Sequence, residues 1–67
     1  MGKMHDGAKI RTLREKRGLT PAAAGELSGM TAQHWNDVES GSRASIALAT
    51  LAKMAKALGV KAKDLLK

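Results

Sequence analysis

Glycines divide this sequence into short helical segments, and this division restricts it to a small all-helical fold. Gly18, Gly29, Gly41 and Gly59 each follow a run of residues rich in good helix formers such as Ala, Leu and Lys, and glycine is the usual residue just beyond a helix C-terminus. No stretch shows the period-2 run of β-branched residues that would indicate a strand. The positions of these glycines and of the helix-forming runs therefore predict five helices, over about residues 6–17, 20–28, 31–41, 46–58 and 62–66.

Start signals and apolar spacing support these helices. Thr20 precedes Pro21, which suits the first turn of a helix, and Thr31 is a second candidate for an N-cap. In the fourth helix the apolar residues recur at intervals of three and four, at Leu48, Leu51, Ala55 and Leu58. Because the connections are short, neighbouring helices must pack directly on one another. We expect one domain over residues 1–67, with 1–5 as a loose N-terminal arm.

Charge and residue content exclude several classes of function. Twelve Lys and Arg against six Asp and Glu give a net charge of +6, which favours a polyanionic partner, although a solvated basic surface is the alternative. The chain has no Cys and two separated His, so we expect neither a disulfide, nor a metal site, nor a cofactor. Trp35 is the only aromatic residue, which argues against base stacking on single-stranded nucleic acid. Without a membrane span or a signal segment, a soluble cytoplasmic protein is expected.

The segment between Gly18 and Gly41 carries the functional information. Two short helices joined by a tight turn at Gly29 follow the helix-turn-helix plan, in which the second helix enters the major groove of DNA. A helix of about nine residues is about 13 Å long and fits a groove about 12 Å wide. On a helical wheel Trp35 and Val38 form its apolar face, and the other side carries Ala32, Gln33, Asn36, Asp37 and Ser40.

The outer side of this second helix offers side chains that can read bases. Gln33 and Asn36 can each form two hydrogen bonds with adenine, and Asp37 can accept one from the amino group of cytosine. Ala32 can contact the methyl group of thymine. The same residues would also suit the exposed side of any amphipathic helix, and periodicity alone does not separate the two interpretations.

The sequence resembles the Cro and phage-repressor type of helix-turn-helix protein, the large XRE-like family. The residues that carry the resemblance are Ile10, Leu13, Arg14, Gly18-Leu19-Thr20, Gly29, Val38-Glu39, Gly41, Leu51, Ala55-Lys56-Ala57-Leu58-Gly59-Val60 and Leu65. The resemblance implies a compact five-helix lambda-repressor-like domain. It also implies a sequence-specific regulator of transcription, namely a small homodimeric repressor that binds an inverted repeat in double-stranded DNA.

The resemblance further implies roles for individual residues. Base-reading positions match Thr31, Ala32, Gln33, Asn36 and Asp37. Phosphate-binding positions match Thr20, Ser42 and Arg43. His34 lies at the rim of this surface and is a further candidate for phosphate contact, although an ordinary surface histidine is the favoured interpretation. Arg14 and Glu39 match a buried ion pair that positions the helices. A dimer interface is expected at Met54, Val60, Leu65 and Leu66, unless these residues only close the core of the monomer.

Several positions depart from the family pattern. Pro21 stands where a Gln usually contacts phosphate, so one phosphate contact is in doubt. Ala24, Gly25 and Ser28 are smaller than usual and Trp35 is larger, so we expect Trp35 to fill the vacated volume of the core. The alternative places Trp35 at the edge of the DNA groove. The loop before the fourth helix is one residue longer than usual, which leaves the match of Arg43 uncertain by one position.

Two other classes of function remain. An antitoxin or bridging module on the same fold would have another protein, such as a toxin, as its main partner. Ser28, His34 and Asp37 supply the residue types of a catalytic triad, but Ser28 should face the core and no enclosed pocket is expected. We therefore expect no enzyme.

Overall fold

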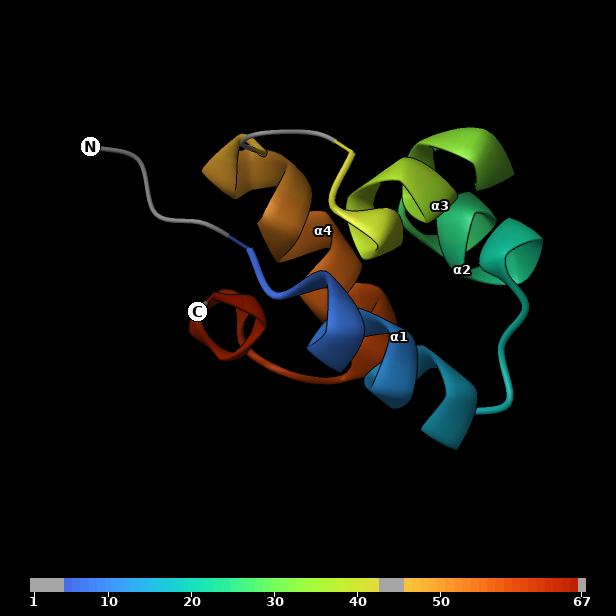
Figure 1. The fold of residues 1–67 in the computed structure, drawn as a ribbon. Coiled ribbons are helices and arrows are strands. Elements are labelled where there is room, and N and C mark those ends of the chain that lie inside the picture. The colour runs from blue at the N-terminus through green and yellow to red at the C-terminus, as the bar shows by residue number, and fades with distance from the viewer. Residues whose placement is uncertain (1–4, 43–45, 67) are drawn as a thin grey trace.

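The computed structural model describes residues 5–42 and 46–66, which form a bundle of short helices (Figure 1). Its elements are α1 (Gly7–Lys16), α2 (Pro21–Leu27), α3 (Ala32–Ser40), α4 (Leu48–Leu58) and the 3-10 helix η1 (Ala62–Leu65). Helix α3 packs against α1 and α2, while α4 packs against α2 and η1. Within the described ranges no helix is long and apolar enough to cross a membrane.

Side-chain caps fix the starts of the first three helices. Asp6, Thr20 and Thr31 each accept a hydrogen bond from the backbone N–H three residues ahead, at 3.0 to 3.1 Å. These bonds satisfy donors that have no partner inside the helix. Helix α4 lacks such a cap and begins at Leu48, later than the predicted start near Ile46.

The predicted fifth α-helix is a single 3-10 turn. Its backbone bonds span three residues rather than four, from Asp64 N to Lys61 O at 2.9 Å and from Leu66 N to Lys63 O at 3.3 Å. A segment of four residues is too short for the i to i+4 ladder of an α-helix, and 3-10 turns are common at this length. The five expected α-helices are therefore four α-helices and one 3-10 helix in the described part of the chain.

The N-terminal segment is tied to the domain at His5. This side chain is only 5% exposed, and its Nε2 donates a hydrogen bond to Val38 O at 2.8 Å. An isolated antiparallel bridge joins His5 to Leu66, and Asp6 N donates to Leu65 O at 2.7 Å. The prediction of a loose arm is therefore wrong for His5. The rest of that predicted arm, residues 1–4, lies outside the described residues.

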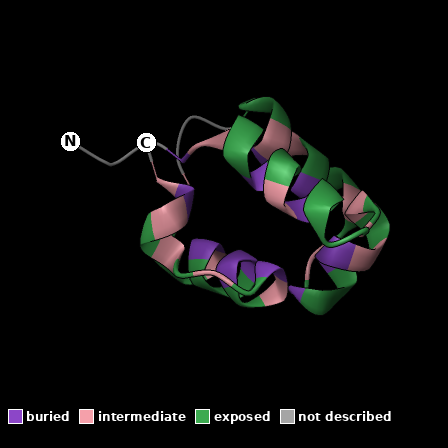
Figure 2. Ribbon diagram, turned by 90° about the horizontal axis from the view of Figure 1, so that it is seen from below, coloured by how far each residue is buried: buried purple, intermediate pink, exposed green. Residues whose placement is uncertain are grey.

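The core draws on every helix (Figure 2). Its buried apolar residues are Ile10, Ala24, Trp35, Val38, Leu51, Met54, Ala55, Leu58 and Leu65. Trp35 is 0% exposed and shares this core with the small residue Ala24. The prediction that Trp35 fills the core is confirmed, and its alternative placement at the edge of a DNA groove is wrong.

Gly25 allows α2 to approach the turn that leads into α3. A Cβ at this position would lie 2.8 Å from Met30 O and 3.0 Å from Thr31 O. Met30 N also donates to Gly25 O at 2.8 Å, which closes the turn. A residue of low helix propensity is therefore needed here, because any larger side chain would meet the backbone of the turn between α2 and α3.

Gly25→Ala should destabilise the protein by roughly 1–3 kcal/mol, because the added methyl group meets backbone atoms that cannot move independently. Helix propensity alone predicts the opposite, a gain of roughly 0.5–1 kcal/mol. Urea unfolding followed by Trp35 fluorescence measures the difference. The control Ala52→Gly, at an exposed position of α4, reports propensity alone. A Gly25→Ala protein more stable than the parent would contradict the close approach.

Candidate nucleic-acid interface

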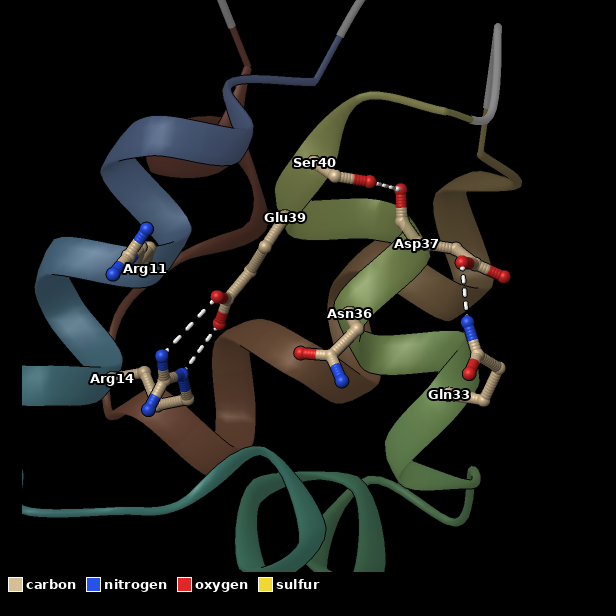
Figure 3. Close-up of a pocket in the computed structure, with 7 residues that line it drawn as sticks. All are labelled: Arg11, Arg14, Gln33, Asn36, Asp37, Glu39 and Ser40. Carbon is tan, nitrogen blue, oxygen red and sulfur yellow. Dashed lines mark hydrogen bonds and ion pairs between the residues drawn. The ribbon is translucent and has the colours of Figure 1, made fainter.

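Helix α3 turns its polar side outward because its apolar side is buried. Trp35 and Val38 are fully buried, whereas Gln33, Asn36 and Ser40 are exposed. In Figure 3, Asn36 and Glu39 extend from α3 toward α1, whereas Gln33 and Asp37 lie on the side of α3 away from α1. These residues border an open hollow of about 450 Å³. The hollow is lined by Arg11, Arg14, Gln33, Asn36, Asp37, Glu39 and Ser40. A basic side chain of α1 thus borders the outer side of α3.

The structure brings the predicted base readers together on the first two turns of α3. Thr31, Gln33 and Asn36 are exposed, and Ala32 and Asp37 are half-buried. Gln33 Nε2 donates a hydrogen bond to Asp37 Oδ1 at 2.9 Å. The two residues therefore act as a pair before any DNA is bound. Contact of these five residues with bases remains a prediction.

The predicted phosphate-binding residues are spread over several elements. Thr20 lies at the start of α2, while His34 borders a hollow that also contains Lys53. Ser42 is held at the end of α3, where its Oγ lies 3.2 Å from Asp37 O. Arg43 lies outside the described residues. Phosphate contact by these four residues therefore remains a prediction.

Glu39 forms the predicted ion pair with Arg14. Arg14 Nε donates to Glu39 Oε2 at 2.5 Å and Nη2 donates to Oε1 at 3.3 Å, so both carboxylate oxygens are engaged. Arg14 Nη1 also donates to Leu19 O at 2.7 Å, which ties the pair to the connection between α1 and α2. Both side chains are about nine-tenths buried.

Trp35 joins this ion pair, which the sequence analysis missed. Its indole Nε1 donates a hydrogen bond to Glu39 Oε2. The signal was the spacing of four residues between Trp35 and Glu39, which places two side chains side by side on a helix. The Glu39 carboxylate therefore accepts hydrogen bonds from two different partners.

The hydrogen bond to Glu39 raises the pKa of the Arg14 guanidinium, and this effect outweighs the opposing effect of burial. Arg14 therefore remains charged, as its buried partner requires. The charge of Glu39 is compensated inside the domain, so this carboxylate adds little repulsion toward phosphate.

The predicted dimer contacts require a correction. Met54 and Leu65 are 0% exposed within the monomer, so their side chains belong to its core and do not offer a surface. Val60 and Leu66 are half-buried. The apolar spacing of a helix shows which side faces inward, but it does not show how much of that side the following segment covers.

An apolar surface that shares only Leu66 with the predicted dimer contacts lies near the start of α4. Leu48 is 67% exposed, and it lines a hollow of about 220 Å³ together with Ile46, Leu51 and Leu66. We name these four residues the Leu48 hollow. Leu48 was part of the apolar spacing in the sequence, which did not distinguish an inward residue from an exposed one.

Comparison with known proteins places this geometry in a family. The sequence model of the helix-turn-helix domain matches residues 7–66. The chain belongs to the helix-turn-helix family. A separate comparison with curated protein sequences found no match.

Solved structures give the type of helix-turn-helix protein. The chain is similar to the restriction-modification controller protein C.AhdI from Aeromonas hydrophila, with 32% identity, 88% of both chains covered and a TM-score of 0.83. It is also similar to the P22 c2 repressor, solved with a synthetic operator, with 28% identity, 91% of both chains covered and a TM-score of 0.83. The clp gene regulator ClgR from C. glutamicum has 27% identity and a TM-score of 0.79, over 88% of this chain and 75% of that one. This helix-turn-helix protein is thus of the Cro and phage-repressor type.

Glu39→Gln should cost roughly 3–5 kcal/mol of stability, because it leaves the buried charge of Arg14 without its counter-ion. Urea unfolding measures the loss, and the fluorescence of folded Trp35 should change because its indole N–H loses a carboxylate acceptor. Glu15→Gln is the matched control, since Glu15 forms an exposed pair with Arg11 at 3.5 Å. That pair contributes only about 0.5 kcal/mol. Equal losses in both variants would contradict the role of burial.

Proposed function

We propose that this helix-turn-helix regulator is a small dimeric repressor that reads an inverted-repeat operator with the outer side of α3. The observation that carries the proposal is the polar outer side of α3. Gln33 and Asn36 project from it on a helix whose other side is locked into the core by Trp35. Side chains that read bases must be held rigidly by their supporting structure. The likeness to the P22 c2 repressor supports the same assignment.

The positive charge of the chain supports attraction to the DNA backbone. A net charge of +6 gives affinity for any duplex, and phosphate contacts then fix the register of α3 in the groove. Thr20, His34, Ser42 and Arg43 remain the proposed phosphate contacts. Pro21 has neither a backbone N–H nor a polar side chain, so the start of α2 offers one donor fewer. The corresponding location is the cytoplasm, with the DNA-bound protein in the nucleoid.

We propose that a second copy of the chain covers the Leu48 hollow. Leu48 is 67% exposed, and a side chain of this kind in a shallow apolar hollow suits a self-complementary contact across a two-fold axis. A dimer would place two copies of α3 on half-sites about 34 Å apart. The same surface also suits another protein, which keeps the antitoxin or bridging module as the second candidate.

We also propose that the chain has no catalytic activity of its own. Ser28 is buried, and its Oγ donates to Ala24 O at 2.9 Å. Ser28 and His34 line one open hollow of about 300 Å³, but Asp37 is not among the residues that line it. This separation does not support the Ser, His and Asp arrangement of a hydrolase.

Selection of bound sequences from random duplex DNA tests the regulator directly. At physiological salt we expect an enriched inverted repeat, with half-sites roughly one helical turn apart. Affinity for this site should fall with a log–log salt slope of roughly −5 to −9 if 6–10 phosphates are contacted. Gln33→Ala should relax the preference at one base position and leave affinity for random duplex unchanged. If the parent protein enriches no sequence, the operator assignment is lost and the interaction module becomes the better candidate.

Leu48→Lys should weaken the dimer, because it places a charge in the proposed interface. Sedimentation equilibrium measures the monomer–dimer constant, and circular dichroism checks that the helices remain. Leu27→Lys is the matched control, since Leu27 is 64% exposed and lines a different hollow. Loss of the dimer in both variants, or in neither, would contradict an interface at the Leu48 hollow.

A further inference from the structure

Gln33 and Asp37 form a hydrogen-bonded pair on the outer side of α3. They are one helical turn apart, and Gln33 Nε2 donates to Asp37 Oδ1 at 2.9 Å (Figure 3). An ionised carboxylate can only accept hydrogen bonds, so the amide must turn its NH₂ group toward Asp37. The orientation of the Gln33 amide is therefore chosen by its neighbour before DNA is present.

The backbone of Asp37 is itself held in place. Its carbonyl oxygen accepts from Ser42 N at 3.2 Å, and the hydroxyl groups of Ser40 and Ser42 each lie 3.2 Å from it. These bonds close the last turn of α3 against the segment that follows. A carboxylate on a fixed backbone can hold a flexible glutamine side chain in a defined direction.

The oriented amide keeps one donor and one acceptor for a base. The second N–H of Nε2 remains for donation, and Oε1 remains for acceptance. The major-groove edge of adenine needs this pair, because its N7 accepts and its N6 amino group donates. Guanine offers two acceptors at the same edge, so an amide in this orientation matches only one of them.

We propose that Asp37 is a positioning residue for Gln33, and that the pair selects adenine at one position of each operator half-site. The inference rests on the proposed function and makes it more specific. It replaces the sequence-based expectation that Asp37 accepts a hydrogen bond from cytosine. Asp37 acts through Gln33 in this arrangement, and its carboxylate need not touch a base.

A carboxylate on this surface weakens the attraction of the protein to DNA, and a positioning role gives a reason for its presence there. Asp37 lies on the proposed DNA-facing side of a chain with a net charge of +6, where a negative charge opposes the attraction to phosphate. Removing that charge should therefore strengthen binding to all DNA. Removing the orientation of Gln33 should weaken the choice among bases.

Asp37→Asn separates these two effects, because asparagine has nearly the same shape but can both donate and accept. We expect affinity for random duplex to rise. At the position that Gln33→Ala also relaxes, discrimination for adenine should fall about twofold or more, as an intrahelical bond of this kind is modest in the free protein. The double variant Gln33→Ala/Asp37→Asn should lose no further discrimination at that position. In the unbound protein, the NMR order parameter of the Gln33 side-chain NH₂ should also fall in Asp37→Asn.

The control Glu26→Gln removes an exposed carboxylate of α2, and it should raise general affinity without changing any base preference. Loss of a cytosine preference at a separate position in Asp37→Asn would overturn the inference, since Asp37 would then read a base itself. An unchanged preference and an unchanged order parameter would also overturn it. If the parent protein selects no sequence, the proposed function itself is contradicted. If it selects a clear operator but Asp37→Asn gives either of these contrary results, only the positioning role of Asp37 is contradicted.

Discussion

The carboxylate of Glu39 is the interaction on which the position of α3 depends. It is about nine-tenths buried, and it accepts from the guanidinium of Arg14 on α1 and from the indole of Trp35 on α3. A buried charge of this kind is stable only while its partners remain, so the domain must keep α1 and α3 in register. Arg14 also donates to Leu19 O at 2.7 Å, which extends the same constraint to the chain that leads into α2. The outer side of α3 is therefore placed by contacts on its inner side.

The large residue of the core and the ion pair are coupled. Trp35 brings more volume into the core, which small residues such as Ala24 accommodate. It also brings an indole N–H, which needs an acceptor when it is buried. Glu39 provides that acceptor from the next turn of the same helix. Trp35, which departs from the family pattern, is thus hydrogen-bonded to Glu39, which matches that pattern.

Residue spacing predicted the parts of the structure that depend on contacts between residues close together in the sequence or on the family motif. The caps at Thr20 and Thr31, the buried side of α3 and the pair of Arg14 with Glu39 all follow from short-range patterns or from the family motif. The burial of His5 could not be predicted in this way, because it depends on a backbone bridge to Leu66 at the far end of the chain. The burial of the apolar residues near η1 was uncertain for the same reason, since coverage by a distant segment leaves no local pattern. The bond between Gln33 and Asp37 could have been predicted from their spacing of four residues.

The two carboxylates of α3 have opposite consequences for DNA binding. The charge of Glu39 is compensated by Arg14 inside the domain, so it stabilises the position of the helix without opposing phosphate. Asp37 is half-buried on the outer side of α3, where its negative charge opposes the attraction to the phosphates of any duplex. Selectivity depends on the ratio of specific to general affinity, so Asp37 improves it only if its hydrogen bond to Gln33 strengthens one base contact. This arrangement suits a regulator with a strongly basic sequence. Such a protein is already attracted to any DNA, and a positioned Gln33 adds the preference for one base sequence.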